Sequence, residues 1–513
     1  MGKVNSSQTS NKRIAKNTIM LYIRMIVMMV VSLITSRVYL SSLGETDFGI
    51  FNVVGGLVIS FAFISNTLQL ATQRFLNYEM GRGDDVKVQK IFSICVILYL
   101  IVSIVFLLIA ETMGVWFLNQ VMNIPNNRIV VANWVYQFAV IGFVFQMIRI
   151  PYNATIIAYE EMNFYAYFSI FEAVIKLVAA YVVYWVAIDK LFVVSSLTML
   201  VYLLITFGYF WYCNRKYPIT HFRWSWDKEK VKELASYSGW NMYGSGCIMV
   251  QNQGVDLIVN YFFGVAVNAA LGIVGQLSNA INQLASNFQV AYNPQLVKFY
   301  AQGRKDSMNQ LICQASKLSF FLLLYAVIPF FFCSDYLLYL WLGEYPNYTD
   351  GFVKIMLVYV LFDSMQAPLW LTVLATANIK KYQIITGSIL LVTLPLVYFS
   401  MYLGGSPLFA WGIRVAIMFV LFVVRLLYLK KYLQFEISIF LTHSVFKCIV
   451  VLLFSIIPPL LISSLICGFV QLISVSLIGV FSISISIYMF GITKEEKKNV
   501  LNVIKLKILR YGS

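Results

Sequence analysis

Long apolar stretches alternate with short polar ones along almost the whole chain. Apolar runs of about 18 residues or more are long enough to cross a bilayer as helices. The pattern predicts fourteen such spans, at residues 17–40, 49–77, 89–110, 130–150, 163–186, 191–213, 233–262, 265–292, 311–333, 352–376, 382–402, 408–429, 441–465 and 469–491. We therefore expect an all-α, polytopic membrane protein.

Composition agrees with a membrane protein, and charge gives it an orientation. The chain is 60% hydrophobic and only 12% charged, which is unusual for a soluble domain. Its net charge of +16 comes mainly from segments that the span pattern places on one side, namely residues 1–16, 82–90, 214–232, 298–317, 380–381, 425–431 and 494–510. Arg128 and Lys190 are the only cations in the loops predicted on the other side. The positive-inside rule then predicts cytoplasmic N- and C-termini, and the charge requires no nucleic-acid partner.

Several kinds of chemistry lack the residues they need. The two histidines, His221 and His443, are far apart, and the seven cysteines form no Cys-x-x-Cys pair, so we expect neither a metal site nor a cofactor. The ATP-binding pattern with glycines followed by lysine and a hydroxyl residue is missing from the sequence. The predicted outer loops, 111–129 and 334–351, are short and poor in paired carboxylates. We therefore expect a protein that is not an enzyme.

The chain contains an internal repeat. At an offset of 220 residues, eight positions of the first half are identical in the second, among them Gly44 with Gly264 and Gly83 with Gly303. The copies are six spans apart, which is an even number, so both enter the membrane from the cytoplasm. The repeat is therefore predicted to be parallel, about an axis along the membrane normal.

The repeat divides the chain into two lobes. We expect a basic cytoplasmic N-terminus at 1–16, a six-span N-lobe at 17–213 and a basic cytoplasmic linker at 214–232. A six-span C-lobe is expected at 233–429, followed by two extra spans within 430–492 and a basic cytoplasmic tail at 493–513.

The first span carries an arginine inside the membrane. Arg24 lies about 10 Å from the cytoplasmic start of the span, where an arginine costs about 2.5–3.5 kcal/mol to insert. Asn17 and Thr35 fall within about 20° of it around the helix, so the span has one polar stripe. Arg37 lies about 220° away, near the outer interface, and is expected to serve another surface.

Four further charged residues inside spans have different expected roles. Arg74 and Arg149 lie close enough to span ends for their side chains to reach the interface. Lys176 follows Glu172 by four residues, so this pair is expected to be neutralised within one helix. Arg414 has no local partner and, like Arg24, is a candidate for function.

The second lobe has polar rows of its own. The eighth span places Gln276, Asn279, Gln283 and Ser286 on one face, and the seventh places Asn252 and Asp256 on the same side as Asn241. Such rows either join helices or line a cavity. Small residues near the start of the seventh span predict close helix approach, at Gly239, Gly244 and Gly246. Two intramembrane acids, Asp256 and Asp363, lack a cation four residues away and are predicted to be ion-coupling sites or partners of arginines.

Three stretches of the first half carry a resemblance to a known family. They are SRVYLSSLGETDFGIFNVVGG at 36–56, ATQRFLNYEMGRGD at 71–84 and IPYNATIIAYEEMNFYAYFSIFEAVIKL at 150–177. These stretches resemble the polysaccharide-biosynthesis flippases of the O-antigen or lipopolysaccharide type, in the MOP superfamily that also contains lipid II flippases and MATE drug exporters. The second half is similar mainly through the repeat and the number of spans.

The resemblance implies a V-shaped pair of lobes around an alternating-access cavity in the bacterial plasma membrane. The implied cargo is an oligosaccharide on undecaprenyl diphosphate, moved to the outer leaflet for O-antigen or capsule-type polysaccharide. In lipid II flippases, which are also similar in having two extra C-terminal spans, the cavity holds arginines, and Arg24 matches one expected place. Substrate-binding candidates are then Arg24, Arg74, Arg149, Arg414, Asn252, Gln276, Asn279 and Gln283. We expect a monomer surrounded by membrane lipid, and a partnership with a polysaccharide polymerase stays open.

Two other functions stay open at this point. MATE-type exporters are similar in carrying acidic cavity residues, including one in the first span, where this chain has arginines and no acid. Asp256 and Asp363 keep a cation-coupled exporter of small molecules in consideration. A membrane glycan polymerase would need larger extramembrane loops than the sequence provides, so it is the weaker alternative.

Overall fold

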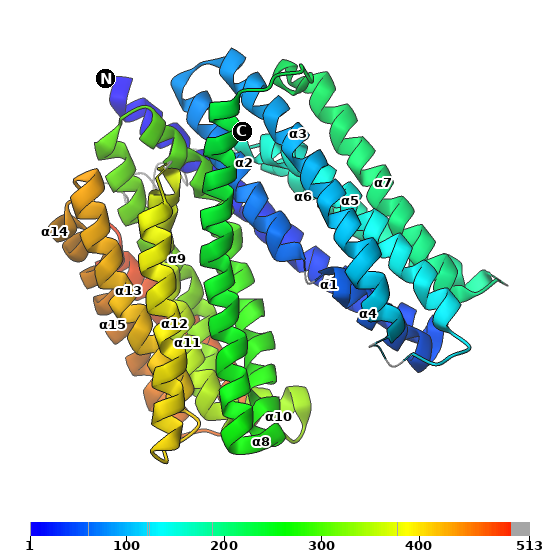
Figure 1. Ribbon diagram of the computed structural model, residues 1–513. Helices are drawn as coiled ribbons and strands as arrows, with labels where there is room; N and C mark the ends of the chain where they lie inside the picture. Colours follow the sequence, from blue (N-terminus) through cyan, green and yellow to red (C-terminus); the bar gives the residue numbers. More distant parts are fainter. Residues whose placement is uncertain are drawn as a thin grey trace, which may run out of the picture. The chain divides into compact units, whose positions relative to one another are not determined.

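The computed structural model describes residues 2–59, 61–120, 122, 124–186, 188–376 and 378–493. Within these ranges every regular element is a helix (Figure 1), which confirms the predicted all-α class. Most of the predicted basic tail, residues 494–513, and the side chains of the basic N-terminus, residues 1–16, lie outside what the structure describes.

The first half forms six helical spans. Its helices are α1 (Gly2–Ile59), α2 (Ala62–Arg82), α3 (Asp85–Ile109), α4 (Val115–Gln120), α5 (Ile129–Ala158), α6 (Met162–Val182) and α7 (Lys190–Lys216). A break at Gly44 divides α1 into the first span and the start of the second, which continues in α2. A π-helical turn, Ala110–Gly114, joins α3 to α4, so the expected outer loop 111–129 is helical as far as Gln120.

The second half adds eight spans. Its helices are α8 (Lys228–Ala301), α9 (Lys305–Phe332), α10 (Ser334–Leu342), α11 (Thr349–Ala375), α12 (Lys380–Tyr402), α13 (Phe409–Leu433), α14 (Ile437–Phe440), α15 (Phe446–Ser463) and α16 (Gly468–Ser486). A break at Gly264 divides α8 into two spans. The short α10 occupies part of the expected outer loop 334–351, and a π-helical turn, Leu441–Val445, joins α14 to α15.

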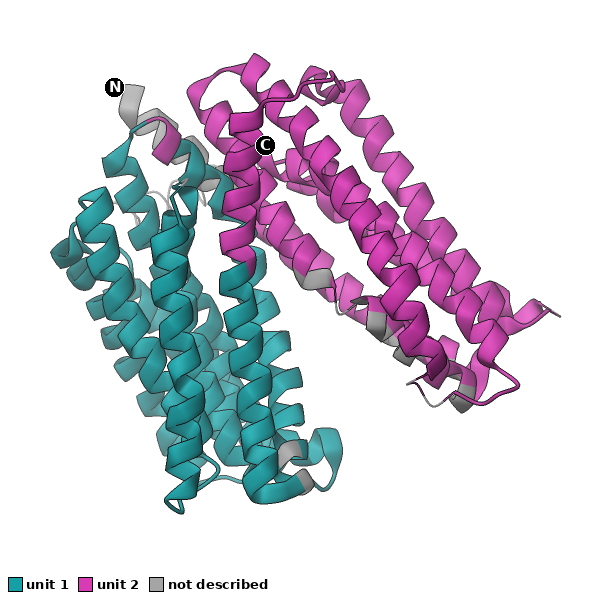
Figure 2. Ribbon diagram, viewed as in Figure 1, with its two compact units in different colours: residues 1–12, 243–299, 303–513 teal, residues 13–242, 300–302 magenta. Residues whose placement is uncertain are grey.

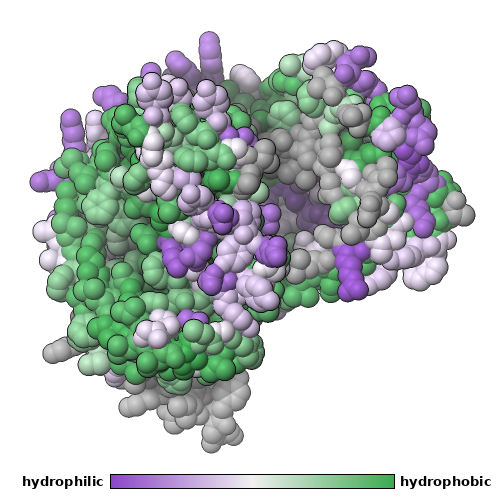
Figure 3. Space-filling model, turned by 90° about the horizontal axis from the view of Figure 1, so that it is seen from below, coloured by the Kyte–Doolittle hydropathy of each residue, from purple (hydrophilic) through white to green (hydrophobic). Residues whose placement is uncertain are grey.

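Eleven helical segments of the described chain are long and apolar enough to cross a membrane. The other three expected spans are the one that runs from α1 into α2 and the two halves of α8. Both halves of α8 carry the predicted amide rows, which lower their hydropathy. Figure 3, a view from below, shows hydrophobic residues over large parts of the surface and hydrophilic residues gathered in patches.

The chain forms two compact units, shown in different colours in Figure 2. We call residues 13–242 and 300–302 the N-terminal unit, and residues 1–12, 243–299 and 303–513 the C-terminal unit. The boundary falls within α8, after Met242, so the basic segment 214–232 packs with the N-terminal unit. Two hydrogen bonds join this segment to α3 of the N-terminal unit: Lys90 Nζ donates to Asp227 at 2.7 Å, and Gln89 donates to the His221 carbonyl at 2.9 Å.

Matching glycines mark the repeat in the backbone. Gly44 has φ 76° and ψ 172°, and Gly264 has φ 77° and ψ −173°, a conformation that is essentially restricted to glycine. Gly83 and Gly303 are both left-handed, with φ 76° and 66°, as is usual just past the end of a helix. The identities at an offset of 220 residues therefore preserve the same turns in both halves.

Close helix packing occurs at some of the predicted small residues. An added Cβ at Gly244 would lie 2.1 Å from Gln383 of α12, and one at Gly254 would lie 2.6 Å from Leu394. Gly239 and Gly246 have open space instead. The first half of α8 thus approaches α12 along a row that includes Gly244 and Gly254, and Gln251 donates to Thr393 of α12 at 2.7 Å in the same contact.

Ion pairs join three helix ends of the N-terminal unit. Arg128, just before α5, donates from Nε to Asp47 of α1 at 2.8 Å and from Nη1 to Asp189 at 2.6 Å. Asp189 also accepts from the backbone N–H groups of Leu191 and Phe192, and so caps α7. Burial opposes ionisation of Asp189, but the bonds from Arg128 and the α7 backbone outweigh it and hold the pKa of this carboxyl below its usual value.

Gly264→Ala should destabilise the protein by about 1–3 kcal/mol, because this backbone conformation is strained for alanine and not for glycine. The added methyl group meets no atom within 4 Å, so the cost is conformational and not steric. Gly272→Ala is the matched control, since Gly272 has equally open space but a helical backbone. Thermal unfolding of the two purified variants in detergent measures the difference. Equal melting temperatures would contradict the assigned role of Gly264.

Candidate functional site

Arg24 lies within the N-terminal unit against an aromatic ring. Its guanidinium carbon is 4.4 Å from the centre of the Tyr165 ring on α6, a distance at which a cation is attracted to the ring face. Its Nε is buried and has no hydrogen-bond partner among the described residues. The side chain is therefore held in place by Tyr165 but retains a donor for an anion.

Arg149 and Lys176 share one acid. Arg149 Nη1 on α5 donates to Glu172 Oε2 at 2.9 Å, and Lys176 Nζ donates to Glu172 Oε1 at 2.8 Å. The expected pair of Lys176 with Glu172 within α6 is therefore present. The sequence did not predict that Arg149 uses the same carboxylate, because this contact depends on how α5 packs against α6.

Tyrosines of α7 connect these charges. Arg149 lies 5.4 Å from the centre of the Tyr209 ring, and Lys176 Nζ lies 4.3 Å from that of Tyr202. Tyr209 is also within electrostatic range of Arg24. We call Arg24, Arg149, Lys176 and Glu172 the cationic cluster.

The cationic cluster has unbalanced charge. Glu172 pairs with Arg149 and Lys176, and Arg24 adds a third cation, so these four residues together carry an excess of two positive charges in a part of the unit that the spans place inside the membrane. Buried charges without counter-ions are costly. An anion carrying two negative charges would balance this cluster, and arginine can bind phosphate oxygens in bidentate fashion.

Arg74 has different surroundings from Arg24. It is buried, with 5% exposure, and its guanidinium lies 4.5, 4.8 and 5.7 Å from the ring centres of Phe75, Tyr78 and Tyr237. The aromatic rings enclose the side chain, and the reach of Arg74 to the membrane interface stays a prediction.

In the C-terminal unit, Arg414 brings two predicted residues together. Its Nη2 lies 3.8 Å from Asp256 Oδ1 and donates to the backbone carbonyl of Asn252 at 3.2 Å. Arg414 is 7% exposed and Asp256 is 41% exposed. The arginine also lies 4.7 Å from the centre of the Trp411 ring. Asp256 therefore has an arginine partner on another helix, α13, which is five spans further along the chain.

The second acid of this unit lies near a cation that the sequence analysis overlooked. Asp363 on α11 is within electrostatic range of Arg425 on α13. Arg425 is buried, and it donates to Gln366 at 2.7 Å and to the Tyr382 hydroxyl at 3.1 Å. The sequence analysis placed Arg425 in a cytoplasmic basic segment, because Lys430 and Lys431 follow it closely. In the structure Arg425 is instead buried between helices.

The amide row of the eighth span keeps its predicted geometry. Gln276, Asn279 and Gln283 are all exposed on the second half of α8, and no hydrogen bond of their side chains is found within the described chain. They therefore present free amide donors and acceptors, which can bind hydroxyl-rich ligands. The neighbouring Asn282 differs, because it donates to Ser278 at 3.2 Å and stays within its own helix.

The comparisons with known proteins rest on structure alone, since no family model and no curated protein matches this sequence. An outward-facing multidrug-resistance MATE transporter of the MOP superfamily superposes with a TM-score of 0.71 at 12% identity, over 82% of this chain and 95% of the other. The MATE transporter ClbM in complex with Rb⁺ gives a TM-score of 0.68 at 14% identity, over 80% and 94%.

A third similar structure is a MOP superfamily transporter from Pyrococcus furiosus. It superposes with a TM-score of 0.66 at 14% identity, over 84% of this chain and 96% of that one. It is described as having a reverse polarity of its binding pocket, which suggests a different function for it. Over more than three quarters of its length, this chain therefore has the fold seen in MATE-type transporters of the MOP superfamily.

Proposed function

We propose that the protein is a flippase that moves undecaprenyl-diphosphate-linked oligosaccharides across the bacterial plasma membrane by alternating access. Its product would serve O-antigen or capsule-type polysaccharide synthesis. The observation that carries the proposal is the excess positive charge of the cationic cluster, with a buried donor of Arg24 left unused. The transporter fold and the three stretches similar to O-antigen-type flippases support the same function.

The chemistry of the cargo fits the polar groups of both units. A diphosphate must exchange its water for fixed donors to cross a bilayer, and the cationic cluster offers two uncompensated charges. The sugar hydroxyls need amide partners, which Gln276, Asn279 and Gln283 provide on an exposed helix face. The polyprenyl tail can stay in lipid throughout. Substrate contacts by Arg74, Arg414 and Asn252 belong to the same proposal.

A cation-coupled exporter is the second candidate, and Asp256 and Asp363 are the observations that favour it. Asp256 lies beside Arg414, and Asp363 is within electrostatic range of Arg425. Each arginine offsets the attraction of its acid for a cationic drug. A cluster with excess positive charge also repels such a drug. The Pyrococcus furiosus transporter, described as having a pocket of reverse polarity, supports the idea that this fold can serve other cargo.

Replacing Arg24 should impair transport strongly. Arg24→Ala removes a charge-assisted contact worth about 1.5–3 kcal/mol, or about 10- to 100-fold in activity. Arg24→Lys should keep part of the activity, because the charge remains but the bidentate geometry does not. Surface glycan and membrane abundance are measured together at native expression.

Arg215→Ala is the matched control for Arg24→Ala. Arg215 also lies over an aromatic ring, 5.5 Å from the centre of Trp211, but it is exposed at the C-terminal end of α7. It should leave export unchanged. Normal glycan export by Arg24→Ala would contradict the role of the cationic cluster.

Asp256 and Arg414 are expected to act as a pair. Asp256→Asn leaves a nearly buried arginine without its counter-ion, so protein abundance and transport should fall, and the double exchange Asp256→Arg with Arg414→Asp should restore both in part. Asn252→Ala is the control for protein abundance alone, since Arg414 bonds only the backbone carbonyl of that residue. Should Asp256→Asn instead keep full abundance and transport cargo independently of the proton and sodium gradients, Asp256 would be a coupling site.

Deleting the protein tests the cargo. A flippase changes no bond, so complete lipid-linked oligosaccharides should accumulate facing the cytoplasm, out of reach of an impermeant lectin or hydrolase. Loss of a polymerase would leave single units at the outer surface, and loss of a drug exporter would change dye sensitivity with normal glycan. Complete units accessible from outside, in a strain without a paralogue, would refute the flippase proposal.

A further inference from the structure

A pocket of about 540 Å³ opens on the N-terminal unit, and none of its lining residues belongs to the cationic cluster. It lies between the end of the first span and the end of α6, where a short 3-10 turn, Val183–Trp185, follows. Its main lining residues are Ile34, Arg37, Ser41, Tyr181, Tyr184 and Trp185.

The position of the pocket along the spans puts it at a membrane interface. Asp47 and Asp189, which form the ion pairs with Arg128, lie a few residues further along the same two segments. The basic segment 214–232 follows the opposite end of α7. Trp185 is 81% exposed, and tryptophan and tyrosine are enriched where a bilayer meets water.

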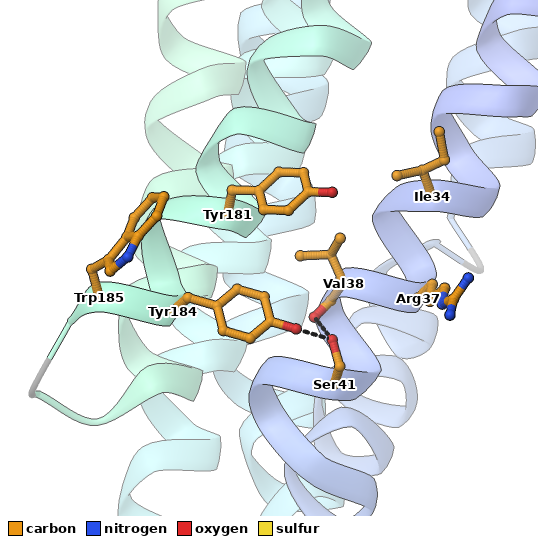
Figure 4. Close-up of a pocket in the computed structure, with 7 residues that line it drawn as sticks. All are labelled: Ile34, Arg37, Val38, Ser41, Tyr181, Tyr184 and Trp185. Atoms are coloured by element: carbon orange, nitrogen blue, oxygen red, sulfur yellow. Dashed lines mark hydrogen bonds between the residues drawn. The ribbon is translucent and has the colours of Figure 1, made fainter.

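Arg37 is a cation without a counter-charge in the described chain. No hydrogen bond or ion pair of its guanidinium is found there, and no carboxylate lines the pocket. Figure 4 shows the rings of Tyr181 and Tyr184 directed toward α1, with Arg37 at the far edge and its guanidinium directed away from both rings. The charge therefore lies at the rim, and the inner part of the pocket is aromatic and aliphatic.

The hydroxyl groups of the pocket are already arranged. The Ser41 and Tyr184 hydroxyls form a hydrogen bond between α1 and the turn after α6, and Ser41 also donates to the Val38 carbonyl at 3.1 Å. This bond fixes one wall of the pocket. Ile34 and Tyr181, which are 40% and 44% exposed, leave the opposite side open toward lipid.

We propose that this pocket binds an anionic glycerophospholipid of the outer leaflet, with its phosphate at Arg37 and an acyl chain against Ile34 and Tyr181. One guanidinium matches the single charge of a phosphodiester, whereas a diphosphate carries more charge than Arg37 can balance. A zwitterionic headgroup finds no carboxylate for its ammonium group. The site is separate from the proposed transport function and does not depend on it.

Native mass spectrometry of the purified protein in detergent tests the charge contact. The Arg24→Ala background lessens competition from the cationic cluster, and the probes are phosphatidylglycerol, phosphatidylcholine and undecaprenyl phosphate. Phosphatidylglycerol should be retained best, and Arg37→Gln should weaken its retention about fivefold, the effect of about 1 kcal/mol for one basic residue. The retention of phosphatidylglycerol by Arg37→Lys should lie between that of the protein with Arg37 and that of Arg37→Gln.

Lys190→Gln is the matched control, because it removes a cation at the same end of the unit without touching the pocket. Phosphatidylglycerol with brominated acyl chains tests whether an acyl chain occupies the pocket. The brominated chains should quench the fluorescence of Trp185, which is the part of the protein's fluorescence that the Trp185→Phe variant lacks. Equal retention by Arg37→Gln and the Lys190→Gln control would overturn the proposal. A preference for undecaprenyl phosphate over phosphatidylglycerol, or no quenching of Trp185, would also overturn it.

Discussion

Charge inside a membrane protein has to be balanced, and the two units of this chain balance it differently. In the C-terminal unit, Arg414 lies beside Asp256 and Arg425 lies near Asp363, so each arginine has an acid. In the N-terminal unit, one carboxylate serves Arg149 and Lys176, and Arg24 lies over the face of Tyr165 with no ion pair among the described residues. Because an uncompensated buried charge is costly, the N-terminal unit is the part whose chemistry calls for an anionic ligand.

The helical framework that holds these charges depends on a few backbone positions. Gly44 and Gly264 adopt the same glycine-only conformation and separate paired spans in the two halves. The second span and the eighth span therefore start from equivalent turns. The tyrosines of α6 and α7 then fix the cations of the N-terminal unit, while the exposed amides of α8 stay available in the C-terminal unit. Folding and ligand chemistry thus use different residues of the same helices.

The fold was predictable because the bilayer imposes simple rules. Span length and hydropathy located the eleven apolar helical segments of the described chain, and the glycine identities predicted turns that the structure shows in both halves. The site was predictable only where a signal is local. Spacing along one helix predicted the pair of Glu172 with Lys176 and the shared face of Gln276, Asn279 and Gln283.

Contacts between helices left weaker traces in the sequence. Nothing local links Arg149 to Glu172, and the lysines near Arg425 gave it the pattern of a cytoplasmic residue. A signal did exist in part, since Tyr165 and Glu172 lie two turns apart on the face of α6 that also carries Lys176. Reading the aromatic and acidic positions of each span as one face would have brought Tyr165 into the candidate site.

Reconstitution of the purified protein tests the central claim most directly. Liposomes would carry an undecaprenyl-diphosphate-linked oligosaccharide, with sidedness followed by an impermeant hydrolase, and a cationic dye would be offered to the same vesicles. The account predicts faster movement of the oligosaccharide between leaflets than in protein-free vesicles, with no movement of the dye. Transport of the dye with an unchanged rate for the oligosaccharide would contradict it.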